Sequence, residues 1–226
     1  MDVIVLIDSF KGSMTSMEAG NAARDGVLRV YPHANVTVRP LADGGEGTTD
    51  ALIEGLGGRK VELSVTGPMG KWVEAYYGIL ADEKTAVMEM AQAAGIMLVE
   101  KAQRNPGKAT TYGVGEMIRD AVSRGCRKFI IGIGGSATND GGIGMLRALG
   151  VKFLTKDGEE AGEGADALGK IHFVSLEHLM PELKECDFQI ACDVTNPLCG
   201  EKGATYIYGK QKGIREEEMP RIDADM

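Results

Sequence analysis

Histidine, tryptophan and paired cysteine are scarce in this sequence. Its 226 residues include three histidines, four cysteines and one tryptophan. The histidines stand singly in polar surroundings, so neither a histidine base nor a histidine metal cluster is expected. No G-x-S-x-G segment is present to support Ser-His-Asp chemistry. The cysteines show no C-x-x-C pair and no histidine at zinc-finger spacing, so we interpret them as reduced, mostly buried thiols.

An excess of basic residues and long apolar runs are also missing. Acidic residues outnumber basic ones by 33 to 25, which argues against a nucleic-acid partner, because phosphate backbones select clustered Lys and Arg. The N-terminal segment MDVIVLIDSFKGS has an acid at position 2 and only a short apolar run, unlike a signal peptide. No segment approaches the roughly 20 apolar residues that cross a bilayer. We expect a cytoplasmic protein with no membrane partner.

Strand and helix patterns alternate along the first part of the chain. An apolar run at 2–7 predicts a buried strand, and the helical spacing after it predicts a helix capped by Ser13 or Thr15. A second strand at 35–41 leads into a second helix that ends near Gly57 and Gly58. This β-α-β-α order favours a parallel sheet with helices on its faces.

The middle of the chain changes to closely spaced strands, because only short turns separate them. The later part returns to helix and strand, with an apolar helix face at 111–124. The expected strands lie at 61–65, 72–80, 85–90, 128–133, 151–154 and 188–191, with a further helix at 143–149.

Glycine is abundant, with 32 residues gathered into a few short segments. Three of these follow a strand and precede a helix: DSFKGS (the 8–13 loop), ADGGEGT (the 42–48 loop) and GIGGSATNDGG (the 132–142 loop). Loops at the carboxyl edge of an open parallel sheet bind ligands, because helix N-termini there offer N–H groups to anions. We therefore expect one active-site cleft built from all three loops.

The 132–142 loop is suited to a phosphate group. Its glycines allow close backbone approach, Ser136 and Thr138 can donate hydrogen bonds, and Asp140 could hold a cation. The alternative is a tight turn with Asn139 or Asp140 as a helix cap. The loop is not a Walker A motif, but Gly132 begins a weak G-x-G-x-x-A match to a dinucleotide site.

The 8–13 and 42–48 loops carry charged side chains. In the 42–48 loop, Asp43 and Glu46 are suited to magnesium coordination or proton abstraction. In the 8–13 loop, Asp8 is suited to the role of a base or metal ligand, and Lys11 to that of a phosphate-binding cation beside it. The alternative for the 42–48 loop is that Asp43 caps the following helix and Glu46 complements its dipole. The alternative for the 8–13 loop is a capped helix start with a solvated lysine.

Further polar residues stand later in the chain. Asp193 and Asn196 in ACDVTNPL offer oxygen ligands at a strand end, although a turn explains them as well. Lys210 and Lys212 could contact phosphate, and Arg104 could clamp a carboxylate bidentately, although exposed basic side chains usually have no specific partner.

Taken in order, these segments resemble the bacterial glycerate kinases over essentially the whole chain. The matching motifs are DSFKGS, LADGGEGT, GPMG, EMAQAAG, RNP, TYGVGE, GIGGSATNDGG, ACDVTNPL and, less perfectly, YGKQKG. The resemblance implies an α/β kinase with a Rossmann-like parallel sheet domain and a smaller α/β domain with a mixed sheet. It implies transfer of the γ-phosphoryl group of ATP to D-glycerate with Mg²⁺, giving 2-phosphoglycerate or 3-phosphoglycerate in organic acid phosphorylation.

With this resemblance the candidate residues receive roles. Catalytic roles fall to Asp8, Lys11, Asp43 and Asp193; substrate binding to Arg104, Ser136, Thr138 and Asn196; nucleotide binding to Gly134, Gly135, Ser136 and Lys212; metal binding to Asp43, Glu46 and Asp140. The expected domains are a Rossmann-like domain at 1–60 and 84–135, a strand-rich insertion at 61–83 and a second domain at 136–226. A homodimer is the assembly considered.

Two features depart from the family pattern. Family members have proline at the position of Lys210, and they continue past the point where this chain stops at RIDADM. We therefore expect a fragment, a truncated product or a partly read chain, and no kinase activity from residues 1–226 alone. The other hypotheses are a nicotinamide-dependent oxidoreductase and an inactive ligand-binding remnant.

Overall fold

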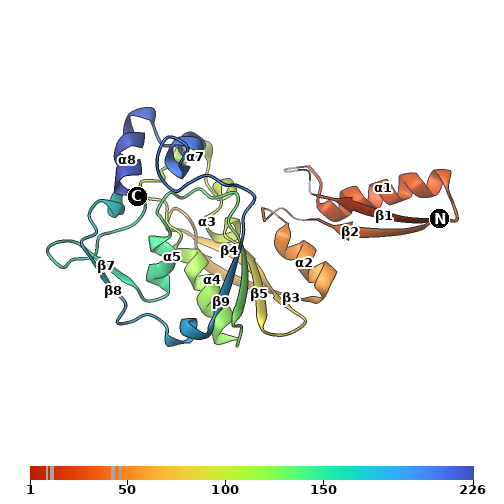
Figure 1. Ribbon diagram of the computed structural model, residues 1–226, viewed down its shortest axis with the longest axis horizontal. Coiled ribbons are helices and arrows are strands. Elements are labelled where there is room, and N and C mark those ends of the chain that lie inside the picture. The colour runs from red at the N-terminus through yellow and green to blue at the C-terminus, as the bar shows by residue number, and fades with distance from the viewer. Residues whose placement is uncertain (9, 11–12, 42–43, 46) are drawn as a thin grey trace.

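A computed structural model describes residues 1–8, 10, 13–41, 44–45 and 47–226. Three candidate residues, Lys11, Asp43 and Glu46, lie outside the described residues. The chain alternates strands and helices around one larger and two smaller sheets, which confirms the α/β class expected from the sequence (Figure 1).

The larger sheet has five strands in the order β3-β4-β5-β6-β9. The first three pair antiparallel, and β5, β6 and β9 run parallel, so the sheet is mixed. The closely spaced middle strands therefore belong to the same sheet as the later parallel strands. Their bounds are β3 Gly58–Thr66, β4 Trp72–Leu80, β5 Thr85–Glu89, β6 Lys128–Gly132 and β9 Asp187–Ala191.

Helices cover both faces of this sheet. Tyr77 in β4 donates a hydrogen bond to Asp120 of α4 (Tyr112–Ser123), with 2.7 Å between the oxygens. The next residue, Gly78, faces α2 (Thr48–Leu56), where an added Cβ would lie 2.7 Å from Ile53 Cδ1. Successive strand residues point to opposite faces, so α4 covers one face and α2 the other. The main core lies on the α4 side and includes Val65, Tyr77, Met88, Met117, Ile118 and Phe129.

The N-terminal unit forms a sheet of its own. Strands β1 (Asp2–Ile7) and β2 (Asn35–Pro40) pair in parallel and are joined by α1 (Ser16–Val30). Thr15 caps this helix in a reciprocal capping box with Glu18. Thr15 is one of the two residues predicted as its cap. The unit lies at one end of the molecule, beyond α2 (Figure 1).

The separate sheet corrects the expectation of a single parallel edge for all three glycine-rich loops. The reason is strand pairing: β5 is bonded to β4 on one side and to β6 on the other, and β9 takes the next position. Neither β1 nor β2 therefore lies in the sheet that carries the 132–142 loop. The domain boundaries expected from the sequence stay a prediction.

The C-terminal part consists of short elements around two small cores. One core contains Ile143, Val151, Phe153, Ala161 and Ala167, and the other contains Ala165, Ile214, Met219 and Ile222. In the described residues no helix is long and apolar enough to span a membrane. The remaining elements are α3 Ala91–Ala94, η1 Ile96–Leu98, η2 Lys101–Gln103, α5 Ile143–Ala148, β7 Lys152–Leu154, α6 Ala165–Leu168, β8 Phe173–Ser175, η3 Pro181–Glu185, α7 Ala204–Lys212, η4 Glu216–Glu218 and α8 Met219–Asp225.

The main core makes a direct prediction about stability. Met117 is fully buried between α4 and the sheet, so Met117→Ala should lower the free energy of unfolding by about 2–5 kcal/mol through lost burial and a cavity. The matched control is Met97→Ala, because Met97 is 84% exposed and should change stability by about 0.5 kcal/mol or less. Urea unfolding of both variants measures the difference. Equal effects would contradict the assigned core.

Candidate active site

The carboxyl ends of three parallel strands meet in register. Glu89 of β5 is paired with Gly132 of β6, and Gly132 is paired with Ala191 of β9. The 132–142 loop and the ACDVTNPL segment therefore leave the sheet side by side. This is the edge at which an open α/β sheet binds ligands.

The 42–48 loop joins them through its glycines. A Cβ at Gly132 would overlap the carbonyl oxygen of Gly44, and a Cβ at Gly44 would lie 2.8 Å from the carbonyl oxygen of Ala191. Gly44 also has a φ of 88°, a conformation that favours glycine. The backbones are thus in direct contact, which only residues without side chains permit. Two of the three predicted loops and the end of β9 share one place.

Glu89 lies under this contact and was not among the predicted site residues. Its Oε1 accepts a hydrogen bond of 2.8 Å from the backbone N–H of Thr49, and its Oε2 accepts one of 3.3 Å from that of Gly47. The side chain is 1% exposed, and burial raises the pKa of its carboxyl. An acid at the end of an otherwise apolar strand was the available sequence signal.

A buried lysine holds the first half of the 132–142 loop. Lys212, at the end of α7, donates hydrogen bonds of 2.7 Å from Nζ to Ser136 Oγ and to the carbonyl oxygen of Thr138. Burial lowers the pKa of Lys212 to about 8, although the negative charge of Asp140 opposes this shift. Three residues predicted for nucleotide or substrate binding are thereby brought together.

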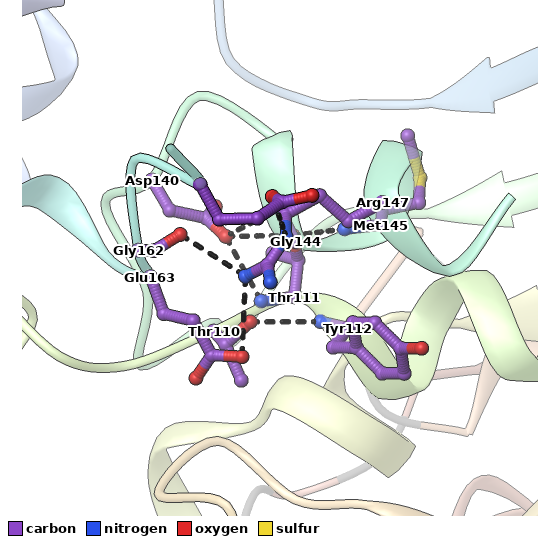
Figure 2. Close-up of polar contacts among 10 residues, drawn as sticks. Thr110, Thr111, Tyr112, Asp140, Gly144, Met145, Arg147, Gly162 and Glu163 are labelled. Atoms are coloured by element: carbon purple, nitrogen blue, oxygen red, sulfur yellow. Dashed lines mark hydrogen bonds and ion pairs between the residues drawn. The ribbon is translucent and has the colours of Figure 1, made fainter. Parts of the chain in front are cut away.

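Asp140 anchors the second half of the same loop (Figure 2). Its Oδ2 accepts hydrogen bonds from the N–H and the hydroxyl of Thr111 at 2.9 and 2.8 Å, and from the N–H of Gly144 at 3.3 Å. Its Oδ1 accepts one from the N–H of Gly142 at 3.1 Å. Thr111 in turn accepts a bond from the N–H of Met145. The carboxylate therefore ties the starts of α4 and α5 together.

This use of Asp140 bears on its predicted metal role. Both oxygens accept hydrogen bonds from protein donors, and the side chain is 2% exposed, so Asp140 anchors the start of α5 as a cap would, although Gly142 and not Asp140 occupies the N-cap position. Within the described residues no three His, Cys, Asp or Glu side chains are grouped closely enough to hold a metal ion. The hydrogen bonds between Asp140 and Thr111 could not be predicted from residue spacing, because the two residues lie far apart in the sequence.

Arg104 lies against the end of α7. Its Nη1 donates a hydrogen bond of 3.0 Å to the carbonyl oxygen of Gln211, the residue before Lys212. In the described structure its Nε is buried without a hydrogen-bond partner. A buried donor with no partner is costly, so this N–H is suited to an anionic ligand.

Asn196 and Asp193 extend beyond β9 on an exposed segment. Asn196 donates to the carbonyl oxygen of Lys202 at 2.9 Å and accepts a bond of 2.6 Å from the hydroxyl of Tyr208, so its amide holds this segment to α7. The Asp193 side chain is exposed to solvent.

Asp8 lies apart from the Ser136 loop. It lines a cavity of about 400 Å³ between the N-terminal unit and the start of α2, which Gly47 and Asp50 also line. Ser136, Lys212 and Asp193 are not among the residues that line it. Of the four residues Asp8, Asp43, Ser136 and Asp193 expected in one cleft, the described ones are thus not all together. Two described glycines of the 42–48 loop connect the two places, since Gly44 contacts Gly132 and Gly47 lines the cavity.

Comparisons with known proteins agree on one family. A model of the glycerate kinase family matches residues 3–226. Glycerate kinase of Halalkalibacterium halodurans is 45% identical over 99% of this chain and 59% of its own length. Glycerate 2-kinase of Escherichia coli is 43% identical over 100% of this chain and 59% of its own length. The chain thus spans about three fifths of these relatives.

A solved structure has the same fold. The crystal structure of a protein assigned as glycerate kinase 2 from Salmonella typhimurium LT2 superposes with a TM-score of 0.90 at 43% identity. The match covers 100% of this chain and 60% of that one.

The contacts of Asp140 make a prediction that separates a cap from a metal ligand. In Asp140→Asn an amide NH₂ would face backbone N–H groups, so the free energy of unfolding should fall by about 2 kcal/mol or more. Thermal and urea unfolding with and without Mg²⁺ measure the loss. If the loss appears only when Mg²⁺ is present, Asp140 is a metal ligand and not a cap.

Proposed function

Because the chain belongs to the glycerate kinase family, we propose that the protein transfers the γ-phosphoryl group of ATP to D-glycerate. The product is 2-phosphoglycerate or 3-phosphoglycerate. The observation that carries the proposal is the buried Lys212 amine set against a glycine-rich loop at the carboxyl ends of parallel strands.

The nucleotide phosphates fit beside this amine. Phosphoryl transfer depends mainly on positioning and on neutralising charge. Gly134 and Gly135 present backbone without side chains next to the Ser136 hydroxyl, and Lys212 supplies a positive charge whose orientation is fixed by two hydrogen bonds. An ammonium group has three donors, so one is left to reach a ligand oxygen.

The carboxylate of D-glycerate fits Arg104. Its Nε, for which the described residues supply no hydrogen-bond partner, lies next to the segment that bears Lys212, because its Nη1 is bonded to Gln211. A guanidinium binds a carboxylate with planar, paired donors, so Arg104 would orient the substrate while Lys212 holds phosphate. The Asn196 amide keeps the exposed segment after β9 against α7.

The family implies a magnesium ion, which would neutralise phosphate charge during transfer. Asp140 does not fit as its ligand, since its oxygens are already used by N–H groups and a hydroxyl. The exposed carboxylate of Asp193 fits better, because hard cations take free oxygen ligands. Asp43 and Glu46 remain ligand candidates from the sequence, and a base near the glycerate hydroxyl remains with Asp8, Lys11, Asp43 or Asp193.

The dinucleotide alternative is less well supported. A dinucleotide fingerprint needs a helix that starts directly at the glycine turn, so that its N-terminus meets the pyrophosphate. Here β6 ends at Gly132 and α5 begins only at Ile143. The glycine pattern in this loop instead accompanies backbone contact with the 42–48 loop.

One assay tests the function. Full-length protein is incubated with ATP, Mg²⁺ and D-glycerate, and the phosphorylated product is identified by NMR. Appearance of a phosphoglycerate supports the proposal and shows which hydroxyl reacts. Glycerate binding without turnover would indicate the ligand-binding remnant, and tight dinucleotide binding without ATP binding would indicate the oxidoreductase.

Lys212 makes the reaction depend on pH in a defined direction. Its pKa is lowered to about 8, so the amine is charged below that pH and becomes neutral above it. A neutral amine attracts phosphate less, so the KM for ATP should rise as the pH increases through 8. Lys212→Met should raise this KM about tenfold or more at pH 7 and flatten its pH dependence.

The control is Lys210→Met, because Lys210 lies on the same helix as Lys212. Lys210 is exposed and bonded to Glu216, so its loss should leave the KM for ATP nearly unchanged. Steady-state kinetics between pH 6.5 and 9 measure both variants, a range chosen about the value near 8. A wild-type KM that stays flat across this range would remove Lys212 from phosphate binding.

A further inference from the structure

We propose that Glu89 is a positioning residue that holds Gly47 and Thr49, where the 42–48 loop meets α2, at the sheet edge in the geometry required for phosphoryl transfer. The inference rests on the proposed function, which it deepens. Glu89 is a buried carboxylate in direct contact with the backbone at the end of the loop.

The orientation of Glu89 follows from strand alternation. In β5, Ala86 and Met88 point into the main core on the α4 side, so Glu89, one residue further, points to the α2 side. There it meets the start of α2 and accepts the hydrogen bonds from Gly47 and Thr49. A carboxylate at a helix N-terminus is favourable, because free N–H groups and the positive end of the helix dipole lie there.

Packing alone does not require a charge at this position. The side chain is buried, its hydrogen-bond partners among the described residues are the uncharged Gly47 and Thr49, and the negative charge of Asp50 on α2 further disfavours its ionised form. A buried carboxylate without a cationic partner costs free energy that an apolar side chain of similar size would not. What the carboxylate adds is a fixed distance between the end of β5 and the start of α2.

That distance links the two glycine-rich loops. While the Glu89 side chain bonds the end of the 42–48 loop, the backbone N–H of the next residue, Met90, donates a 2.9 Å hydrogen bond to the carbonyl oxygen of Gly132. Two adjacent residues at the end of β5 therefore hold both loops. Gly44 then contacts Gly132 directly, and Gly47 lines the cavity that contains Asp8.

The consequence for the reaction is specific. In the proposed function Lys212 and Ser136 hold phosphate, and the described hydrogen bonds of Glu89 do not reach either of them, whereas the 42–48 loop bears the carboxylates expected to act in the transfer step. A small displacement of that loop should slow transfer more than it weakens ATP binding. Glu89→Gln should therefore lower kcat about tenfold or more and change the KM for ATP by about twofold or less.

The test combines kinetics with amide hydrogen exchange in full-length protein. Glu89→Gln keeps the volume but turns an NH₂ group toward a backbone N–H, so protection should fall at Gly47 and Thr49 and stay unchanged in α4. The matched control is Tyr77→Phe, which removes a partly buried hydrogen bond to a carboxylate on the other face of the sheet. That control should lose stability without the selective fall in kcat.

The outcomes separate this inference from the proposed function. Local loss of protection with a lowered kcat supports the role of Glu89. Unchanged kinetics, parallel changes in kcat and KM, a variant that fails to fold, or protection lost throughout the chain would overturn it. If wild-type protein does not phosphorylate glycerate at all, the proposed function fails, and the exchange data alone decide whether Glu89 holds the loop.

Discussion

Contact between backbones at the carboxyl end of the large sheet is the constraint on which the candidate site depends. Gly44, Gly132 and Ala191 approach so closely that side chains at the two glycines would meet carbonyl oxygens. Because glycine has no side chain, the loops can converge at the strand ends. The in-register ends of β5, β6 and β9 supply the rigid base for this contact, since their ladder bonds fix the three strand ends relative to one another.

Two buried charges of opposite sign then set the shape of the 132–142 loop. Lys212 holds Ser136 and Thr138, and Asp140 holds the loop to the starts of α4 and α5. Glycine-rich backbone has much conformational freedom and costs entropy to order. The hydrogen bonds that Lys212 donates and Asp140 accepts offset that cost. A loop able to approach phosphate closely is thereby held in one conformation.

The sequence predicted most of the regular elements, because their patterns are local. The apolar face of α4 is buried as its 3.6-residue spacing predicted, and Thr15 caps α1 as its position before that helix predicted. The elements β8 and α6 were missed because they have only three and four residues, and α7 was missed because the residues that it buries, Thr205, Gly209 and Lys212, form no apolar face. The separate sheet of β1 and β2 was missed for another reason: strand order depends on pairing between distant segments.

The candidate site followed the same division. The glycine-rich loops were visible in the sequence, whereas Glu89 and the partners of Asp140 depend on contacts across the fold. Lys212 shows how far apart such partners are, since 76 positions separate it from Ser136. A peptide or excised subdomain that contains only β6 and its loop would have the glycine pattern without the ammonium group that orders it. The glycine motif can thus be identified from the local sequence. Its ordered conformation depends on the tertiary structure that joins α7 to the sheet.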